Sequence, residues 1–301
     1  MKVPKFCVAV LAMILVSSPM YGQFTGGAST VGGTVAGPTD SQAWFLVMGD
    51  SNAAGQSSQT IVDTTPYDSR LYSYVYTMND ALSYLNDSIW HNCGACKSAW
   101  PTLAGEWMEK RNEPISIIMA AYGGTNIEQN QNHAVALDDY IDQDCVQGFV
   151  PRANTVPGSE GQFYCWAKAQ YEEALALKWL RPQQLKAILL ILGSGDASFC
   201  NAHADVEAKV EEFASGVLRD FGKPVVVAPI GDQADWVAVA GKNAACLAAV
   251  NLAMDHAITD HSNIFAGPNL DDLDHSVDGI HIEEMDTLGK RWYTVLNALF
   301  P

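Results

Sequence analysis

From residue 43 to the C-terminus, short runs of apolar residues alternate with longer segments in which apolar residues recur at helical spacing. Runs that are apolar at nearly every position are typical of strands buried on both faces, and strands that alternate with helices pair in parallel. We therefore predict a three-layer α/β/α fold with a central parallel sheet, formed by a single domain over residues 41–301. The predicted strands are Ala43–Met48, Ile115–Ala121, Ala187–Leu192, Pro224–Ile230 and Ile264–Ala266, and the predicted helices are Thr102–Lys110, Tyr164–Leu180, Ala204–Phe221, Lys242–Ile258 and Glu283–Leu299.

The N-terminal segment has the pattern of a signal peptide over residues 1–22. Lys2 and Lys5 precede the apolar stretch Val8–Val16, and small residues follow it at Ser17–Gly22. This order of charge, apolar core and small-residue exit predicts export, with a secreted or periplasmic product. Residues 23–40 are rich in glycine, threonine and serine, which predicts a flexible leader before the folded domain.

The chain has seven cysteines, and all but Cys7 lie beyond the predicted signal peptide. An even number of cysteines in an oxidising compartment favours disulfides, although the sequence alone leaves the pairing open. Pairing of neighbours is the simplest arrangement: Cys93 with Cys96, Cys145 with Cys165, and Cys200 with Cys246. The first pair also has the spacing of a redox or zinc half-site, but no second Cys-x-x-Cys completes a metal set, so we favour a structural bridge.

The charge balance excludes some classes of partner. The chain carries 17 basic and 34 acidic residues, a formal net charge of −17 at pH 7. Such a charge opposes binding to nucleic acid and to anionic membranes. The sequence contains neither the Gly-x-x-x-x-Gly-Lys motif of nucleotide-binding loops nor a His-Glu-x-x-His zinc motif. We therefore expect no nucleic-acid or membrane partner, no cofactor and no metal.

Two motifs carry the residue types of a serine hydrolase. The block Gly49-Asp50-Ser51-Asn52 directly follows the first predicted strand, and Asp278-Gly279-Ile280-His281 precedes the last predicted helix. A serine on a turn after a strand can act as the nucleophile, a histidine as its base, and an aspartate can orient the imidazole. The alternatives are that Ser51 is only a turn residue, that His275 is the base, or that Asp278 caps the helix beginning near Glu283.

At these residues the chain resembles the SGNH (GDSL-type) hydrolases, and within them the sialate O-acetylesterase-like carbohydrate esterases, whose first block reads Gly-Gln-Ser-Asn. The second block of that branch, Gly-Gly-Thr, corresponds to Gly123-Gly124-Thr125 after the second predicted strand, and its last block corresponds to Asp278–Ile282. The resemblance implies a flavodoxin-like sheet. It also implies Ser51, Asp278 and His281 as catalytic residues, with Gly124, Gly123, Asn52 and Gly195 as oxyanion or substrate contacts.

The third block departs from this pattern. In the wider family it reads Gly-x-Asn-Asp, and in the carbohydrate branch Gln-Gly-Glu-x-Asp, with a side-chain amide near the oxyanion. Here the segment is Gly193-Ser194-Gly195-Asp196, so the amide position falls on Gly195 in one register and on Leu192 in the other. Neither supplies a side-chain donor, and the loss of one such donor typically lowers kcat by ~10²–10³. Asn52, Asn126 and Asn201 are the candidate substitutes.

Two long segments follow the first two blocks, and we expect both to lie over the site. Residues 57–99 are rich in tyrosine, and residues 126–160 are polar. Long loops of this kind are often binding walls, and aromatic side chains suit sugar rings. Together these features predict an esterase that removes O-acetyl groups from a carbohydrate or another small ester. The alternatives are a polysaccharide O-acetyltransferase and a non-catalytic carbohydrate-binding protein with the same scaffold.

Overall fold

A computed structural model describes residues 42–55, 57, 74–76, 82–84, 97–121, 123, 127, 162–200, 202–231 and 234–301, which belong to one compact unit. The predicted signal peptide and leader lie outside the described residues, as do Cys93, Cys96 and Cys145. Within the described part of the chain, no helix combines the length and apolar character needed to cross a membrane.

The described strands form one seven-stranded sheet in the order β3-β2-β4-β1-β5-β6-β7. All neighbouring strands pair in parallel except β2 and β3, which are antiparallel. The predicted α/β fold with a central parallel sheet is therefore confirmed. The strands are β1 (Ala43–Gly49), β2 (Tyr74–Tyr76), β3 (Leu82–Tyr84), β4 (Ile115–Ala121), β5 (Leu185–Ile191), β6 (Val225–Ala228) and β7 (Ile264–Ala266).

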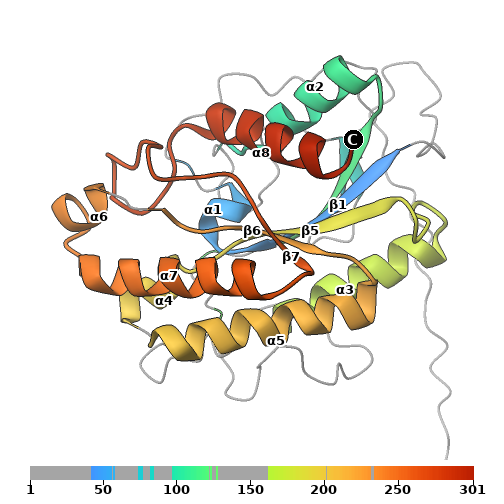
Figure 1. Cartoon of the computed structure of the whole chain (residues 1–301). Coiled ribbons are helices and arrows are strands. Elements are labelled where there is room, and N and C mark those ends of the chain that lie inside the picture. The colour runs from blue at the N-terminus through green and yellow to red at the C-terminus, as the bar shows by residue number, and fades with distance from the viewer. Residues whose placement is uncertain are drawn as a thin grey trace, which may run out of the picture. The chain divides into compact units, whose positions relative to one another are not determined.

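Helices cover both faces of this sheet (Figure 1). Phe45 and Val47 of β1 pack in a core with α2 (Trp100–Arg111) and α8 (Met285–Leu299). Trp44, Leu46 and Met48 point to the opposite face, where they pack with α3, α5 and α7. Because successive side chains of a strand alternate between the two faces of the sheet, a strand that is apolar throughout packs into a hydrophobic core on each face. The remaining helix bounds are α1 (Ser51–Ala54), α3 (Gln162–Ala176), α4 (Ser194–Phe199), α5 (His203–Phe221), α6 (Ala234–Ala238) and α7 (Ala244–Asp260).

The five predicted strands and five predicted helices all form, with small changes at their ends. Strand β6 ends at Ala228, directly before Pro229, which has no N–H for the ladder. Helix α3 ends at Ala176 instead of Leu180, and Lys178 beyond it adopts a left-handed conformation with φ of 60°. The tyrosine-rich segment differs more from expectation. The sequence predicts a loop over the site, but part of the segment forms the strand pair β2 and β3 at the edge of the sheet.

The strand order indicates where a ligand would bind. After β1 the chain forms β2, β3 and β4, which all lie on one side of β1, and from β4 it crosses over β1 to β5 on the other side. In sheets of this kind ligands bind at the carboxyl ends of the strands where the order reverses, here between β1 and β5. The segments that follow those two strands are Asp50-Ser51-Asn52 and Leu192-Gly193-Ser194, which are parts of the first and third blocks.

One predicted disulfide is confirmed. Cys200, at the C-terminal end of α4, is bonded to Cys246 in the first turn of α7. Cys165 is also disulfide-bonded, and its predicted partner Cys145 lies outside the described residues. The Cys200–Cys246 bridge thus ties the helix after β5 to one of the long helices that cover the sheet.

Candidate active site

Ser51 lies on a sharp strand-to-helix turn. Gly49, the last residue of β1, has φ of 139°, a conformation that only glycine adopts readily. The N–H of Asp50 donates to the carbonyl of Ile191 at the end of β5, with 3.0 Å between N and O. Asp50 then caps α1, because its carboxylate accepts from the N–H of Asn52 at 2.9 Å. This turn places Ser51 as the first residue of α1 at the carboxyl edge of the sheet.

The buried carboxylate of Asp50 joins the first block to the third. It accepts a hydrogen bond from the hydroxyl of Ser194, the first residue of α4. Burial raises the pKa of Asp50, and the hydrogen bonds from Ser194 and Asn52 oppose that rise. Because the described hydrogen bonds of this carboxylate come from these two turns, we assign Asp50 to holding the site together and not to proton transfer.

Asp278 and His281 form a closely bonded pair in the loop between β7 and α8. Nδ1 of His281 lies 2.5 Å from Oδ2 of Asp278, and Oδ1 accepts from the backbone N–H groups of Ile280 and His281, each at 2.8 Å. Burial acts to raise the pKa of Asp278, but the hydrogen bonds from His281 and Ile280 outweigh it, and the pKa is lowered. The carboxylate therefore stays charged and holds the imidazole by Nδ1, which leaves Nε2 for proton exchange.

Asn52 connects this loop to the nucleophile turn. Its side-chain N–H donates to the carbonyl of Ile280 at 3.2 Å, and its Oδ1 accepts from the N–H of Ile282 at 2.9 Å. The residue after Ser51 thus binds the main chain immediately before and immediately after His281. These bonds place the loop that carries His281 against the helix that begins at Ser51. The resemblance predicts Asn52 as an oxyanion or substrate contact, and in the structure its amide binds the main chain of the histidine loop.

The other readings of these motifs fit the structure less well. His275 is buried, with Nδ1 3.2 Å from the carbonyl of Ile280, so it contacts the inside of the same loop. Burial lowers its pKa, which keeps the ring neutral. Helix α8 begins at Met285 with Glu284 at its N-cap, so Asp278 lies too far upstream to cap it.

Two of the candidate oxyanion residues, Gly123 and Gly195, lie beyond the ends of the strands that flank β1. Gly123 is partly exposed just after β4, and Gly195 is partly exposed in the first turn of α4, after β5. Leu192 is fully buried in the core, so its side chain does not face the site. Asp196 is buried and accepts from the N–H of Ile127 at 3.1 Å, which ties the third block to the segment after the second. Gly124, Asn126 and Asn201 lie outside the described residues.

For the serine hydrolase that the sequence predicts, with His281 as its base, we expect Asn52→Ala to lower kcat by about 10–100-fold with little change in KM, because a misplaced base slows the chemical step more than it weakens binding. Asn52→Asp keeps the acceptor for the N–H of Ile282 and should lose less. Asn263→Ala is the matched control, since Asn263 makes a similar bond to the carbonyl of Ala214, in the middle of α5. Steady-state kinetics of the three variants test this role, and equal losses in the Asn52 and Asn263 variants would contradict it.

The comparisons with known proteins bear on the fold. No protein-family model matches the sequence, and no curated protein matches it significantly. The solved structures that resemble this protein include the following three. A protein from Arabidopsis thaliana has a TM-score of 0.61 at 14% identity, over 86% of this chain and 99% of its own. NanS has a TM-score of 0.57 at 12% identity, over 88% and 99%.

The third is a carbohydrate acetylesterase from Xanthomonas citri, with a TM-score of 0.56 at 13% identity, over 83% of this chain and 54% of its own. This chain therefore spans about half the length of the Xanthomonas structure. At such low sequence identity, the similarity to these three structures shows a shared fold and nothing more. The chain has the same α/β fold as these proteins, one of which is a carbohydrate acetylesterase.

Proposed function

We propose that this protein is a serine esterase that removes O-acetyl groups from a carbohydrate. The observation that carries the proposal is the hydrogen-bonded pair of Asp278 and His281, held by Asn52 beside the turn that presents Ser51. Nucleophile, base and orienting acid come from two segments at the edge of the sheet where the strand order reverses. The shared fold with a carbohydrate acetylesterase supports the choice of substrate class.

The reaction would proceed through an acetyl-enzyme. Oγ of Ser51 attacks the ester carbonyl carbon while Nε2 of His281 takes its proton, and the charged Asp278 stabilises the imidazolium. The backbone N–H groups of Ser51 and Gly124 would hold the oxyanion. Collapse of this intermediate breaks the bond to the sugar oxygen, which receives the proton from His281. Water, deprotonated by His281, then attacks the acetyl carbonyl, and acetate leaves as the Ser51 hydroxyl is restored.

The test is acetate release by the purified protein from O-acetylated oligosaccharides and from p-nitrophenyl acetate. We expect release from both by the wild type and by Ser215→Ala, a control at an exposed serine of α5, and none above background by Ser51→Ala. Glycan binding without any acetate release would favour the carbohydrate-binding alternative. Acetyl groups that appear on an added sugar acceptor instead of as acetate would favour the transferase.

The third block provides a separate prediction. In one of the two registers of the resemblance, Gly195 takes the position where the wider family has asparagine, and it lies in the first turn of α4. If the oxyanion is held only by backbone donors, Gly195→Asn should raise kcat by ~10-fold, since one preorganised donor is worth at least that much. The measurement is kcat on p-nitrophenyl acetate beside Gly195→Leu, which adds similar bulk without a donor. An equal response of both variants would show that the amide is not used.

A further inference from the structure

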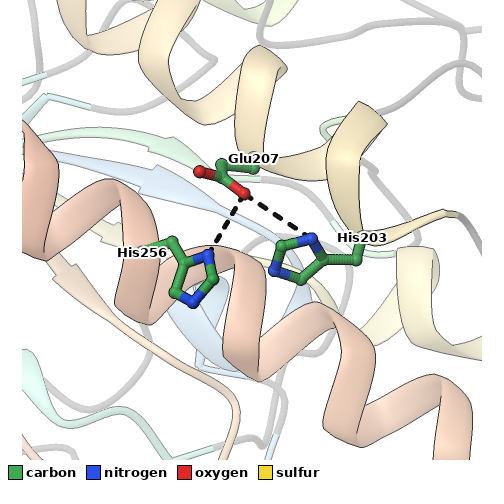
Figure 2. Close-up of side chains that lie close together, drawn as sticks. All are labelled: His203, Glu207 and His256. Atoms are coloured by element: carbon green, nitrogen blue, oxygen red, sulfur yellow. Dashed lines mark ion pairs between the residues drawn. The ribbon is translucent and has the colours of Figure 1, made fainter.

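Three potential metal ligands meet between two helices that cover one face of the sheet. His203 and Glu207 are one turn apart on α5, and His256 lies on α7. Residues four apart on a helix share a face, so His203 and Glu207 both reach the same neighbour. Figure 2 shows the two imidazoles next to each other, each joined by a dashed line to the carboxylate of Glu207. One ligand atom from each residue lies within 4.8 Å of the others.

The distances fit coordination better than hydrogen bonding. Nδ1 of His203 and Nδ1 of His256 lie 3.5 and 3.4 Å from the same carboxylate oxygen, Oε2 of Glu207. Hydrogen bonds from N–H to O are usually about 2.7–3.2 Å long. Ligand atoms around a tetrahedral zinc ion, with bonds of about 2.0–2.2 Å, lie about 3.4 Å apart. The two rings meet nearly at right angles, with centroids 4.9 Å apart.

We propose that His203, Glu207 and His256 bind a zinc ion that links α5 to α7. Imidazole nitrogen with one carboxylate oxygen is a ligand set that suits Zn²⁺, whereas Ca²⁺ and Mg²⁺ prefer oxygen ligands alone. Three protein ligands leave a fourth position for water. The side chains of His203, Glu207 and His256 are 28, 22 and 48% exposed, so an ion can enter from solvent.

The surroundings indicate the strength and role of the site. Nε2 of His203 is buried without a hydrogen-bond partner, so this ligand lacks the acceptor that usually orients a metal-bound imidazole. Such outer partners are typically worth about 10–100-fold in affinity, so we expect weaker zinc binding than at a site in which every imidazole has one. The Cys200–Cys246 disulfide already joins the segment before α5 to the start of α7. The zinc ion would be a second cross-link between the same parts of the chain, and its role would be stability.

The same two helices provide a matched control. His261, directly after α7, and Glu211 on α5 are also in contact, with Nε2 and Oε1 3.0 Å apart. That distance is within hydrogen-bond range, and the pair contains one histidine. It is therefore an ordinary histidine–carboxylate contact in the same environment, and its removal should leave zinc binding intact.

The experiment is zinc titration of the untagged, chelator-treated protein, by calorimetry and by metal analysis after dialysis. We expect one ion per chain and a rise in Tm of about 5 °C at a hundredfold excess over Kd. His256→Ala and Glu207→Gln should each weaken binding by at least about 100-fold, since they remove a ligand and not merely its outer partner. His261→Ala should bind as the wild type does. Circular dichroism at 25 °C checks that each variant is folded.

Three outcomes would overturn the proposal. The first is no binding by the folded wild-type protein at millimolar zinc. The second is unchanged affinity in His256→Ala, which would place any bound ion elsewhere. The third is loss of binding in His281→Ala with retention in His256→Ala, which would place the ion at the proposed catalytic pair. Because none of these readouts is an activity, the zinc site and the proposed esterase can fail independently.

Discussion

Replacing Ser51 by alanine should lower the kcat for ester hydrolysis by about 10⁴–10⁶-fold, because the acetyl-enzyme cannot form without its hydroxyl. KM should change little, since the hydroxyl contributes mainly to the reacting geometry. His281→Ala should cost a similar amount, because the hydroxyl is a weak nucleophile until a base takes its proton. Steady-state kinetics on p-nitrophenyl acetate, with acetate release from an acetylated oligosaccharide, measure both losses.

The double variant Ser51→Ala/His281→Ala makes this prediction specific. Catalytic residues that act as one unit show strongly non-additive effects, so the double variant should be about as active as either single one. Losses that multiply would show that the two residues act separately. A Ser51→Ala protein with more than a tenth of wild-type activity would remove Ser51 from the mechanism. A folded but inactive wild-type protein would instead favour the alternative of a non-catalytic carbohydrate-binding protein.

The second large effect concerns folding. Gly49→Ala should destabilise the protein by at least about 4 kcal/mol, in the range reserved for severe backbone or core disruption. A Cβ at this position would lie 1.9 Å from the carbonyl oxygen of Ile191 and 2.8 Å from Cβ of Ala53. That carbonyl is the acceptor for the N–H of Asp50, so the clash falls on the bond that forms the nucleophile turn. The φ of 139° adds strain of its own.

A substitution at Gly222 distinguishes the steric clash of an added Cβ from the strain of a positive φ. Gly222 ends α5 with φ of 62°, and an added Cβ there meets no atom within 4 Å. Gly222→Ala should therefore cost only the conformational term, about 1–2 kcal/mol. Urea unfolding followed by circular dichroism compares the two variants. If Gly49→Ala is no less stable than Gly222→Ala, the close packing of β1 on β5 at this turn is not the constraint that we describe.

The architecture was predictable because the signal for it is local. A strand that is apolar at nearly every position, such as Ile115–Ala121, packs against a hydrophobic core on each of its two faces, and helices on both faces of a parallel sheet complete those cores. The sequence does not predict strands β2 and β3, because the prediction depends on a local run of apolar residues. Their sequences, Tyr74-Val75-Tyr76 and Leu82-Ser83-Tyr84, are short and lie in a polar, tyrosine-rich stretch, so no continuous apolar run marked them. Pairing at the edge of the sheet, beside β4, decided their conformation.

The sequence by itself determined which side chains we assign to the candidate site. Ser51 follows a strand, and Asp278 and His281 are three residues apart, so both the turn and the histidine–carboxylate pair are encoded by near neighbours. Only the tertiary structure decided what holds these groups together. Asn52 bonds to main-chain atoms more than 220 positions away, and His256 reaches Glu207 from a different helix. Such contacts depend on how two elements pack, and because neither partner changes the local pattern of the other, the sequence carries no short-range signal for them.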